Sequence, residues 1–109
     1  VVHKDIIESH DDELFDITQG WFKALKQMKD EPVDSYKFIA SRMKVTNREA
    51  KESYYGLSLP SLDENKKLLT GSPAPISQTF DRLTEHMKRS GLIRQNTTHK
   101  AVLNSSFLP

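Results

Sequence analysis

The chain of 109 residues contains no cysteine, only four glycines and no long apolar run. Without cysteine, it forms neither a disulfide framework nor a thiolate metal site. The few glycines leave no glycine-rich loop of the kind that cradles phosphate. No segment is apolar over the length needed to cross a bilayer. The first residues lack an initiator methionine and a signal-peptide pattern, so we expect them to lie within a processed or longer protein.

An excess of charge of one sign is also lacking. The 16 basic and 15 acidic residues are interspersed along the chain and leave a formal net charge of +1. Such a balanced surface produces no strong field for nucleic acid or an anionic bilayer, and we predict no nucleic-acid partner. Hydrophobic residues make up 36% of the chain, so any core depends on apolar side chains that share the same helix faces.

The strongest periodicity lies between residues 11 and 30. Its apolar positions are Leu14, Ile17, Trp21, Leu25 and Met28, with Phe15, Thr18 and Phe22 beside them. Steps of three and four residues predict an amphipathic helix of about five turns, in which Trp21 is buried. Ser9 and Asp12 resemble a capping box at its start. Gly20 costs a helix interior about 1 kcal/mol relative to alanine, which suggests close packing at that position.

Shorter helices are predicted on both sides of this one. Residues 4–9 form a short turn of helix. Pro32 begins the next helix at a position where its missing N–H does no harm. Thr46 and Glu49 fit the capping-box pattern of a helix that continues to Gly56. The apolar face of this region consists of Tyr36, Ile39, Ala40 and Met43.

The second half of the chain begins with an extended segment at residues 57–62, since Pro60 disfavours a paired strand there. Asp63 is expected to cap a brief helix through Leu69. Residues 70–75 are the clearest loop. The last full helix ends at Gly91, and its inner face consists of Phe80, Leu83, Thr84 and Met87.

The two ends of the chain complete the prediction. Val1 and Val2 are β-branched and resemble the end of a strand. Residues 101–103 and 107–108 are apolar and resemble a tail that packs onto another surface. The sequence therefore predicts a mainly α chain with four or five short helices, all within one segment that spans residues 1–109.

Histidines and carboxylates are the first candidates for chemistry. The four histidines, His3, His10, His86 and His99, form no recognisable metal-ligand motif, so we predict a structural role for each, with His86 at the surface. The carboxylates group at predicted helix starts, where capping and the helix dipole account for them. They are Asp11, Asp12, Glu13 and Asp16, then Asp30 and Glu31, then Asp63 and Glu64.

Two weaker candidates remain. The turn at residues 70–72 contains a single glycine, so we interpret it as an ordinary loop and not as an anion-binding site. Lys88, Arg89, Arg94 and Lys100 form a local basic patch, but no aromatic residues alternate with them to stack on bases. We therefore predict no catalytic, cofactor-binding or metal-binding residue in this chain and no enzymatic activity. The sequence leaves its ligand-binding residues unknown.

The order of motifs nevertheless resembles one family. Residues 1–7 are similar to a strand exit, and residues 10–12 to a helix start in which Asp11 stands where that family often has proline. Residues 20–25, with the sequence GWFKAL, are similar to the body of an aromatic-rich helix. Residues 31–32 resemble a second helix start, and residues 40–46 a turn in which Lys44 replaces the usual glycine. The later motifs follow at residues 55–60, 63–65, 90–93 and 104–108.

In this order and spacing, the motifs resemble the C-terminal region of the periplasmic solute-binding proteins for nitrate, sulfonate and taurine. The same superfamily includes thiamine-precursor binders and synthases. The resemblance implies a helical C-terminal part of a two-lobed α/β domain with the type II periplasmic-binding-protein fold. It also implies that the intact protein captures a small solute for an ABC permease, in the periplasm or outside the cell on a membrane anchor.

The family's ligand-contacting residues lie mainly upstream of this region, so the resemblance assigns no binding residue to the chain. The alternative is a helical sensor or interaction module without a transport role. If the helices pack on a sheet in a larger protein, the isolated chain exposes apolar surface and is expected to form a homodimer. The apolar residues outside the helical stripes are Leu59, Leu62, Val102, Leu103 and Phe107.

Overall fold

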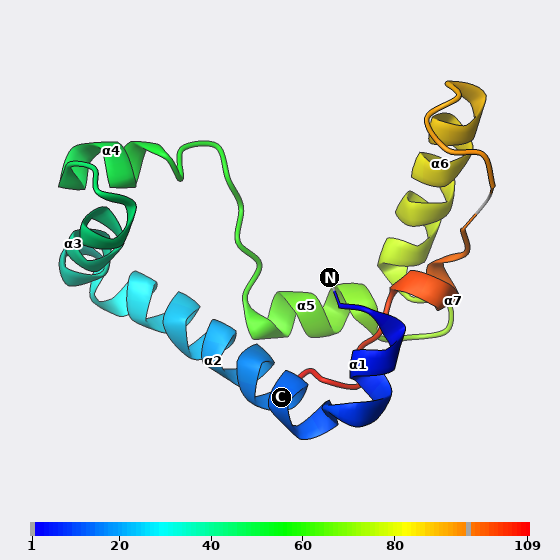
Figure 1. The fold of residues 1–109 in the computed structure, drawn as a ribbon, viewed down its shortest axis with the longest axis horizontal. Coiled ribbons are helices and arrows are strands. Elements are labelled where there is room, and N and C mark those ends of the chain that lie inside the picture. The colour runs from blue at the N-terminus through cyan, green and yellow to red at the C-terminus, as the bar shows by residue number, and fades with distance from the viewer. Residues whose placement is uncertain (1, 96) are drawn as a thin grey trace.

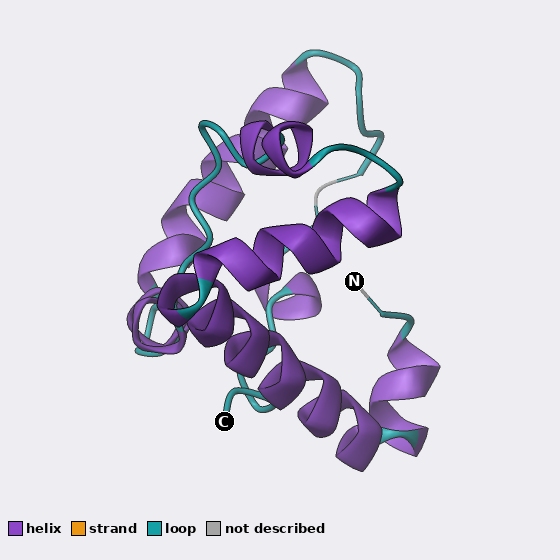
Figure 2. Ribbon diagram, turned by 90° about the vertical axis from the view of Figure 1, so that its left-hand side faces the viewer, coloured by secondary structure: helices purple, strands orange, loops and turns teal. Residues whose placement is uncertain are grey.

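The computed structural model describes residues 2–95 and 97–109, and within them the chain folds into seven helices (Figure 1). In chain order they are α1 (Lys4–Ser9), α2 (Asp11–Asp30), α3 (Pro32–Met43), α4 (Asn47–Glu52), α5 (Leu62–Leu69), α6 (Pro75–Arg89) and α7 (His99–Val102). None of the described residues lies in a strand (Figure 2). The prediction of a mainly α chain is confirmed, although the helices are more numerous than the four or five expected.

The ends of the chain differ from the sequence prediction. Val1 lies outside the described residues, and Val2 is exposed and belongs to no strand. At the other end, the predicted tail forms the short helix α7. Leu103, Phe107 and Leu108 follow it and are half-buried, whereas Val102 is exposed. Part of the tail thus packs on the rest of the chain, as expected.

The helices form a U-shaped arrangement that is open on one side (Figure 1). The accessible surface is 9049 Å², whereas a compact monomer of this mass has about 6,200 Å². The radius of gyration is 17.1 Å, against about 13 Å for a compact domain of this length. Among the described residues, only Ala40, Ala50 and Ser77 are buried. The chain alone therefore has almost no hydrophobic core.

The best-packed region is the corner between α3 and α4. Ala40 and Ala50 are 3% and 0% exposed, so the two helices meet through small side chains. Tyr36 and Tyr54 pack edge to face beside them, with ring centroids 5.9 Å apart. Such aromatic pairs stabilise a fold by about 0.5–1.5 kcal/mol beyond the area that they bury. This corner is the closest approach to a core in the described chain.

Helix α2 has the predicted length, but its apolar stripe is only partly covered. Leu14, Phe22, Leu25 and Met28 are half-buried, while Trp21 is 51% exposed. The predicted burial of Trp21 is wrong, because no second layer covers that side of the helix. The close packing inferred at Gly20 is also wrong, since a Cβ atom built there meets nothing within 4 Å.

The predicted capping residues are correct at one helix and wrong at two others. Thr46 and Glu49 form the capping box of α4. At α5 the capping box joins Ser61 and Glu64, and Asp63 lies inside the first turn instead of at the cap. The expected box at the start of α2 is absent, because Ser9 is the last residue of α1 and its hydroxyl donates to the carbonyl of Asp5.

Other helix boundaries lie close to proline and glycine residues, as predicted. Pro32 begins α3 and Pro75 begins α6. Helix α6 ends at Arg89, two residues before Gly91, which adopts a φ of 71°. Helix α4 is shorter than predicted: it ends at Glu52, and turns lead from there to Gly56. Residues 57–61 lie in neither a helix nor a strand, whereas Leu62, expected in the same segment, is the first residue of α5.

The inner face of α6 is also shallower than predicted. Phe80, Thr84 and Met87 are half-buried, but Leu83 is 55% exposed. Leu83 therefore does not belong to the covered face in this arrangement. Within the part of the chain that the structure describes, no helix combines the length and apolar content needed to cross a membrane.

Lys44 ends α3 in the left-handed region, with a φ of 56°. A side chain in this conformation costs about 1 kcal/mol relative to glycine. We expect Lys44→Gly to raise the free energy of unfolding by about 1 kcal/mol, measured by urea denaturation. Lys44→Ala is the matched control, since it removes the side chain beyond Cβ without relieving the strain. Equal stability of the two variants would contradict this account of Lys44.

The two capping boxes create a dependence on pH. The backbone N–H and the hydroxyl of Thr46 both hold the pKa of Glu49 below its usual range, and those of Ser61 do the same for the pKa of Glu64. A carboxylate whose pKa is lower in the folded state stabilises the fold above its unfolded pKa of about 4.3. This stability is lost as the pH falls through the folded pKa.

We therefore expect helicity, followed by circular dichroism, to fall as the pH is lowered through and below about 4. Glu64→Gln should remove part of this pH dependence and lower helicity at neutral pH. Glu8→Gln makes the same charge change at an exposed position in α1 outside any capping box. If both variants changed the acid transition equally, capping would not be its cause.

Candidate functional site

The four histidines lie in separate environments. His3 accepts a long hydrogen bond from the N–H of Asp5, and Nδ1 of His10 lies 2.7 Å from the hydroxyl of Ser9. His86 is exposed in the last turn of α6. His99 is half-buried and is the one that contacts a distant part of the chain. Within the described residues, no three histidines or carboxylates gather into a group that could hold a metal ion.

The carboxylates mostly occupy the positions that the sequence suggested. Asp11, Asp12 and Glu13 lie in the first turn of α2, where the helix dipole favours negative charge. Asp30 differs, because it is the last residue of α2 and pairs with Lys26 one turn earlier. The prediction that Asp30 marks a helix start is therefore wrong, although the next helix does begin at Pro32.

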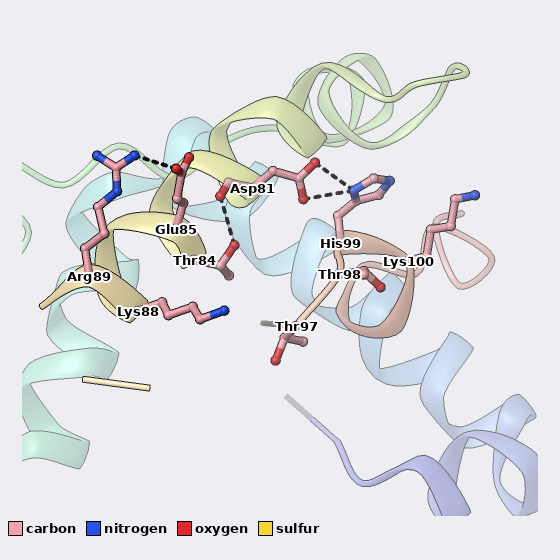
Figure 3. Close-up of a pocket in the computed structure, with 9 residues that line it drawn as sticks. All are labelled: Asp81, Thr84, Glu85, Lys88, Arg89, Thr97, Thr98, His99 and Lys100. Carbon is pink, nitrogen blue, oxygen red and sulfur yellow. Dashed lines mark hydrogen bonds and ion pairs between the residues drawn. The ribbon is translucent and has the colours of Figure 1, made fainter. Parts of the chain in front are cut away.

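A polar groove of about 750 Å³ runs between α6 and residues 97–100 (Figure 3). Asp81, Glu85, Lys88 and Arg89 face it from α6. Thr97, Thr98, His99 and Lys100 line the opposite side. Three of the four residues of the predicted basic patch thus lie together here, and the fourth, Arg94, does not line the groove.

One contact joins the two sides of this groove. Nδ1 of His99 lies 3.1 and 3.2 Å from the two carboxylate oxygens of Asp81, and the close-up shows the two side chains pointing toward each other. The pair joins residues that are 18 positions apart in sequence. It thereby ties the C-terminal segment to the first half of α6.

The groove contains both acidic and basic side chains besides Asp81 and His99. Arg89 donates to Glu85 on the same helix at 2.6 Å. Lys88 extends into the groove from the last turn of α6 (Figure 3). All of these side chains are largely exposed, apart from His99. A groove with mixed and exposed charges favours contact with a polar surface over tight enclosure of a small molecule.

The turn at residues 70–72 lies close to this groove. Gly71 and Ser72 line a smaller space of about 200 Å³ together with His99 and Lys100. Gly71 has a φ of 108°, which suits glycine alone. The loop prediction is confirmed, and the sequence did not indicate that this loop and the C-terminal segment meet.

A second groove, of about 1150 Å³, lies between α2, α5 and the last residue of the chain. Its apolar lining comes from the inner face of α2 and the start of α5, including Phe22, Leu25, Met28, Leu59 and Leu62. Lys29 and Lys67 lie near the carboxylate of Glu64 and contribute to lowering its pKa. Pro109 enters the groove from one side. This groove is broad and open, and its lining is mainly apolar.

The sequence had indicated the residues of this second groove only indirectly. Leu59 and Leu62 were expected to need a partner because they lie outside the helical stripes, and they now lie beside the stripe of α2. Periodicity identified the stripe of α2, but no sequence signal showed that Leu59 and Leu62 face it. The His99–Asp81 contact had no sequence signal at all.

Comparisons with protein-family models, with curated proteins and with solved structures find no match to this chain.

The contact between His99 and Asp81 leads to a test of how the C-terminal segment is held. Asp81→Asn removes the negative charge and should loosen residues 99–103. A half-exposed polar contact of this kind stabilises by about 0.5–1 kcal/mol, so we expect amide exchange in α7 to rise about two- to fivefold. Asp34→Asn in α3 is the control, because its partner Lys37 lies on the same helix. Unchanged exchange in α7 would show that other contacts hold the segment.

Proposed function

We propose that this chain is the helical C-terminal part of a solute-binding protein of the nitrate, sulfonate and taurine type. In this proposal the intact protein has two α/β lobes, binds a small solute between them and delivers it to an ABC permease from the periplasm, or from outside the cell on a membrane anchor. The chain itself contributes scaffold and performs no reaction.

The observation that carries the proposal is the uncovered apolar surface of the helices. The accessible surface of 9049 Å² exceeds that of a compact monomer by about 2,900 Å². A helix with one apolar stripe is stable when that stripe packs against a second layer. The half-covered stripes of α2 and α6 thus suit helices that lie against a sheet supplied by the rest of a larger domain.

The order of sequence motifs adds support of a different kind. The aromatic helix body at residues 20–25 lies within α2, and the turn at residues 40–46 links α3 to α4. The glycine of the motif at residues 90–93 follows the end of α6. These three motifs lie in helices or turns, whereas the strand exit expected at residues 1–7 does not appear among the described residues, because Val2 belongs to no strand and Lys4–Ser9 form α1.

The proposed mechanism is closure of two lobes on a ligand. Binding shifts the population toward a closed state, and the permease recognises that state. The solute would lie between the lobes, upstream of this chain. The two grooves described above are open surfaces, and neither provides convergent and enclosed polar groups for a small anion.

A helical sensor or interaction module without a transport role is the second candidate. The observation in its favour is the exposed outer face of α2, which the packing of α2 on other helices leaves free. Such a module would act through protein partners and would not need a solute.

Calorimetric titration separates these candidates. We expect the protein that joins this chain to the two-lobed domain to bind one of nitrate, taurine, alkanesulfonates or pyrimidines with a micromolar dissociation constant. The chain alone should give no saturable heat with any of them. Absence of binding by the two-lobed protein to all four, or micromolar binding by the chain alone, would contradict the proposal.

A further inference from the structure

Charge along α2 is divided between its two halves, apart from Asp30 at its end, which pairs with Lys26. Every charged residue from position 11 to 22 is acidic, namely Asp11, Asp12, Glu13 and Asp16. Every charged residue from position 23 to 29 is basic, namely Lys23, Lys26 and Lys29. The division is opposite to the helix dipole, so it stabilises α2 itself. It also makes α2 complementary to an antiparallel copy of itself.

The boundary between the acidic and the basic half lies on the outward face of α2. Glu13, Gly20 and Gln27 are seven residues apart and therefore share one side of the helix. Asp16, Ile17, Lys23 and Ala24 flank them, and all seven residues are exposed, Ile17 to 68%. The half-buried residues of the inner face, such as Leu14, Thr18 and Leu25, lie on the opposite side. Helix α2 forms an outer edge of the molecule (Figure 1).

Gly20 lies at the midpoint of this face, and neither its backbone conformation nor its packing within the chain requires glycine. It costs the helix about 1 kcal/mol relative to alanine. Its φ is not in the left-handed region, and a Cβ atom built on it meets nothing within 4 Å. Alanine or a larger residue would therefore fit the isolated chain. A glycine at an open position of a helix lets a second helix approach the backbone closely.

We propose that the outward face of α2 binds the same face of a second copy of this chain, with the two helices antiparallel and a two-fold axis beside Gly20. In this arrangement, Asp16 of each copy lies near Lys23 of the other, because the two positions are nearly equidistant from residue 20. Ile17 and Ala24 then meet across the axis. The contact is isologous, as expected of a symmetric dimer.

The length of α2 sets the extent of such an interface. A helix of 20 residues provides a contact about 30 Å long. The dimer does not rest on the proposed function, since it uses the side of α2 that faces away from the apolar interior.

Charge reversal tests the pairing directly. Asp16→Lys alone and Lys23→Asp alone each place like charges opposite one another twice in the dimer. Each should raise the dissociation constant about tenfold, measured by sedimentation equilibrium. The double variant D16K/K23D restores opposite charges and should return the constant to within about threefold of the original. Arg82→Asp in the middle of α6 is the matched control and should leave association unchanged.

Gly20 provides an independent test. Gly20→Leu should stabilise the monomer, because leucine favours helix and finds open space, yet it should abolish the dimer by keeping the helices apart. Gly20→Cys introduces the only cysteine of the chain and should form an intermolecular disulfide rapidly on oxidation. Gln78→Cys on α6 should not. Circular dichroism verifies that each variant keeps its helices.

Three results would overturn the proposal. The wild-type chain could remain monomeric up to high micromolar concentration. The single charge variants and Gly20→Leu could associate as strongly as the wild type, which would place any dimer interface elsewhere. The double variant could fail to recover while keeping its helicity, which would exclude the Asp16–Lys23 pairing. None of these results bears on solute binding by the two-lobed protein, so the two proposals succeed or fail separately.

Discussion

The structure depends on one constraint: an amphipathic helix needs a second surface against which to bury its apolar stripe. Within the described residues, α3 and α4 come closest to supplying that surface to each other, through Ala40 and Ala50, although Met43 on the predicted apolar face of α3 is 51% exposed. Elsewhere the apolar stripes are half-covered, and few side chains are buried. Most hydrophobic stabilisation comes from removing apolar area from water, so the uncovered apolar area is the largest unmet energetic requirement of the fold.

Local interactions explain why the helices nevertheless begin and end where they do. Capping boxes at Thr46 and Ser61 satisfy backbone N–H groups without help from distant residues. Proline at the first positions of α3 and α6, and glycine after α6, act in the same local way. Ion pairs one turn apart on α2, α4 and α6 add modest support. The elements are therefore set by short-range chemistry, whereas their arrangement depends on few contacts.

The two proposals address different sides of α2. Its inner side, with Phe22 and Leu25, suits the apolar layer of a larger domain. Its outer side combines divided charge with an open glycine and suits a second helix of the same kind. Trp21 lies between the two sides and is half exposed, so its environment depends on which surface is covered first. A protein that uses both sides would be a symmetric pair of larger two-lobed molecules.

The sequence by itself determined the fold class and most of the helix boundaries. Periodicity, proline, glycine and capping residues act within a few positions, and these signals can be read along the chain. Only the tertiary structure decided what covers each stripe. It left Trp21, Leu83 and Gly20 open, and it brought His99 to Asp81 across 18 residues. Such contacts depend on how helices pack in space, and periodicity identifies an apolar face without naming the surface that meets it.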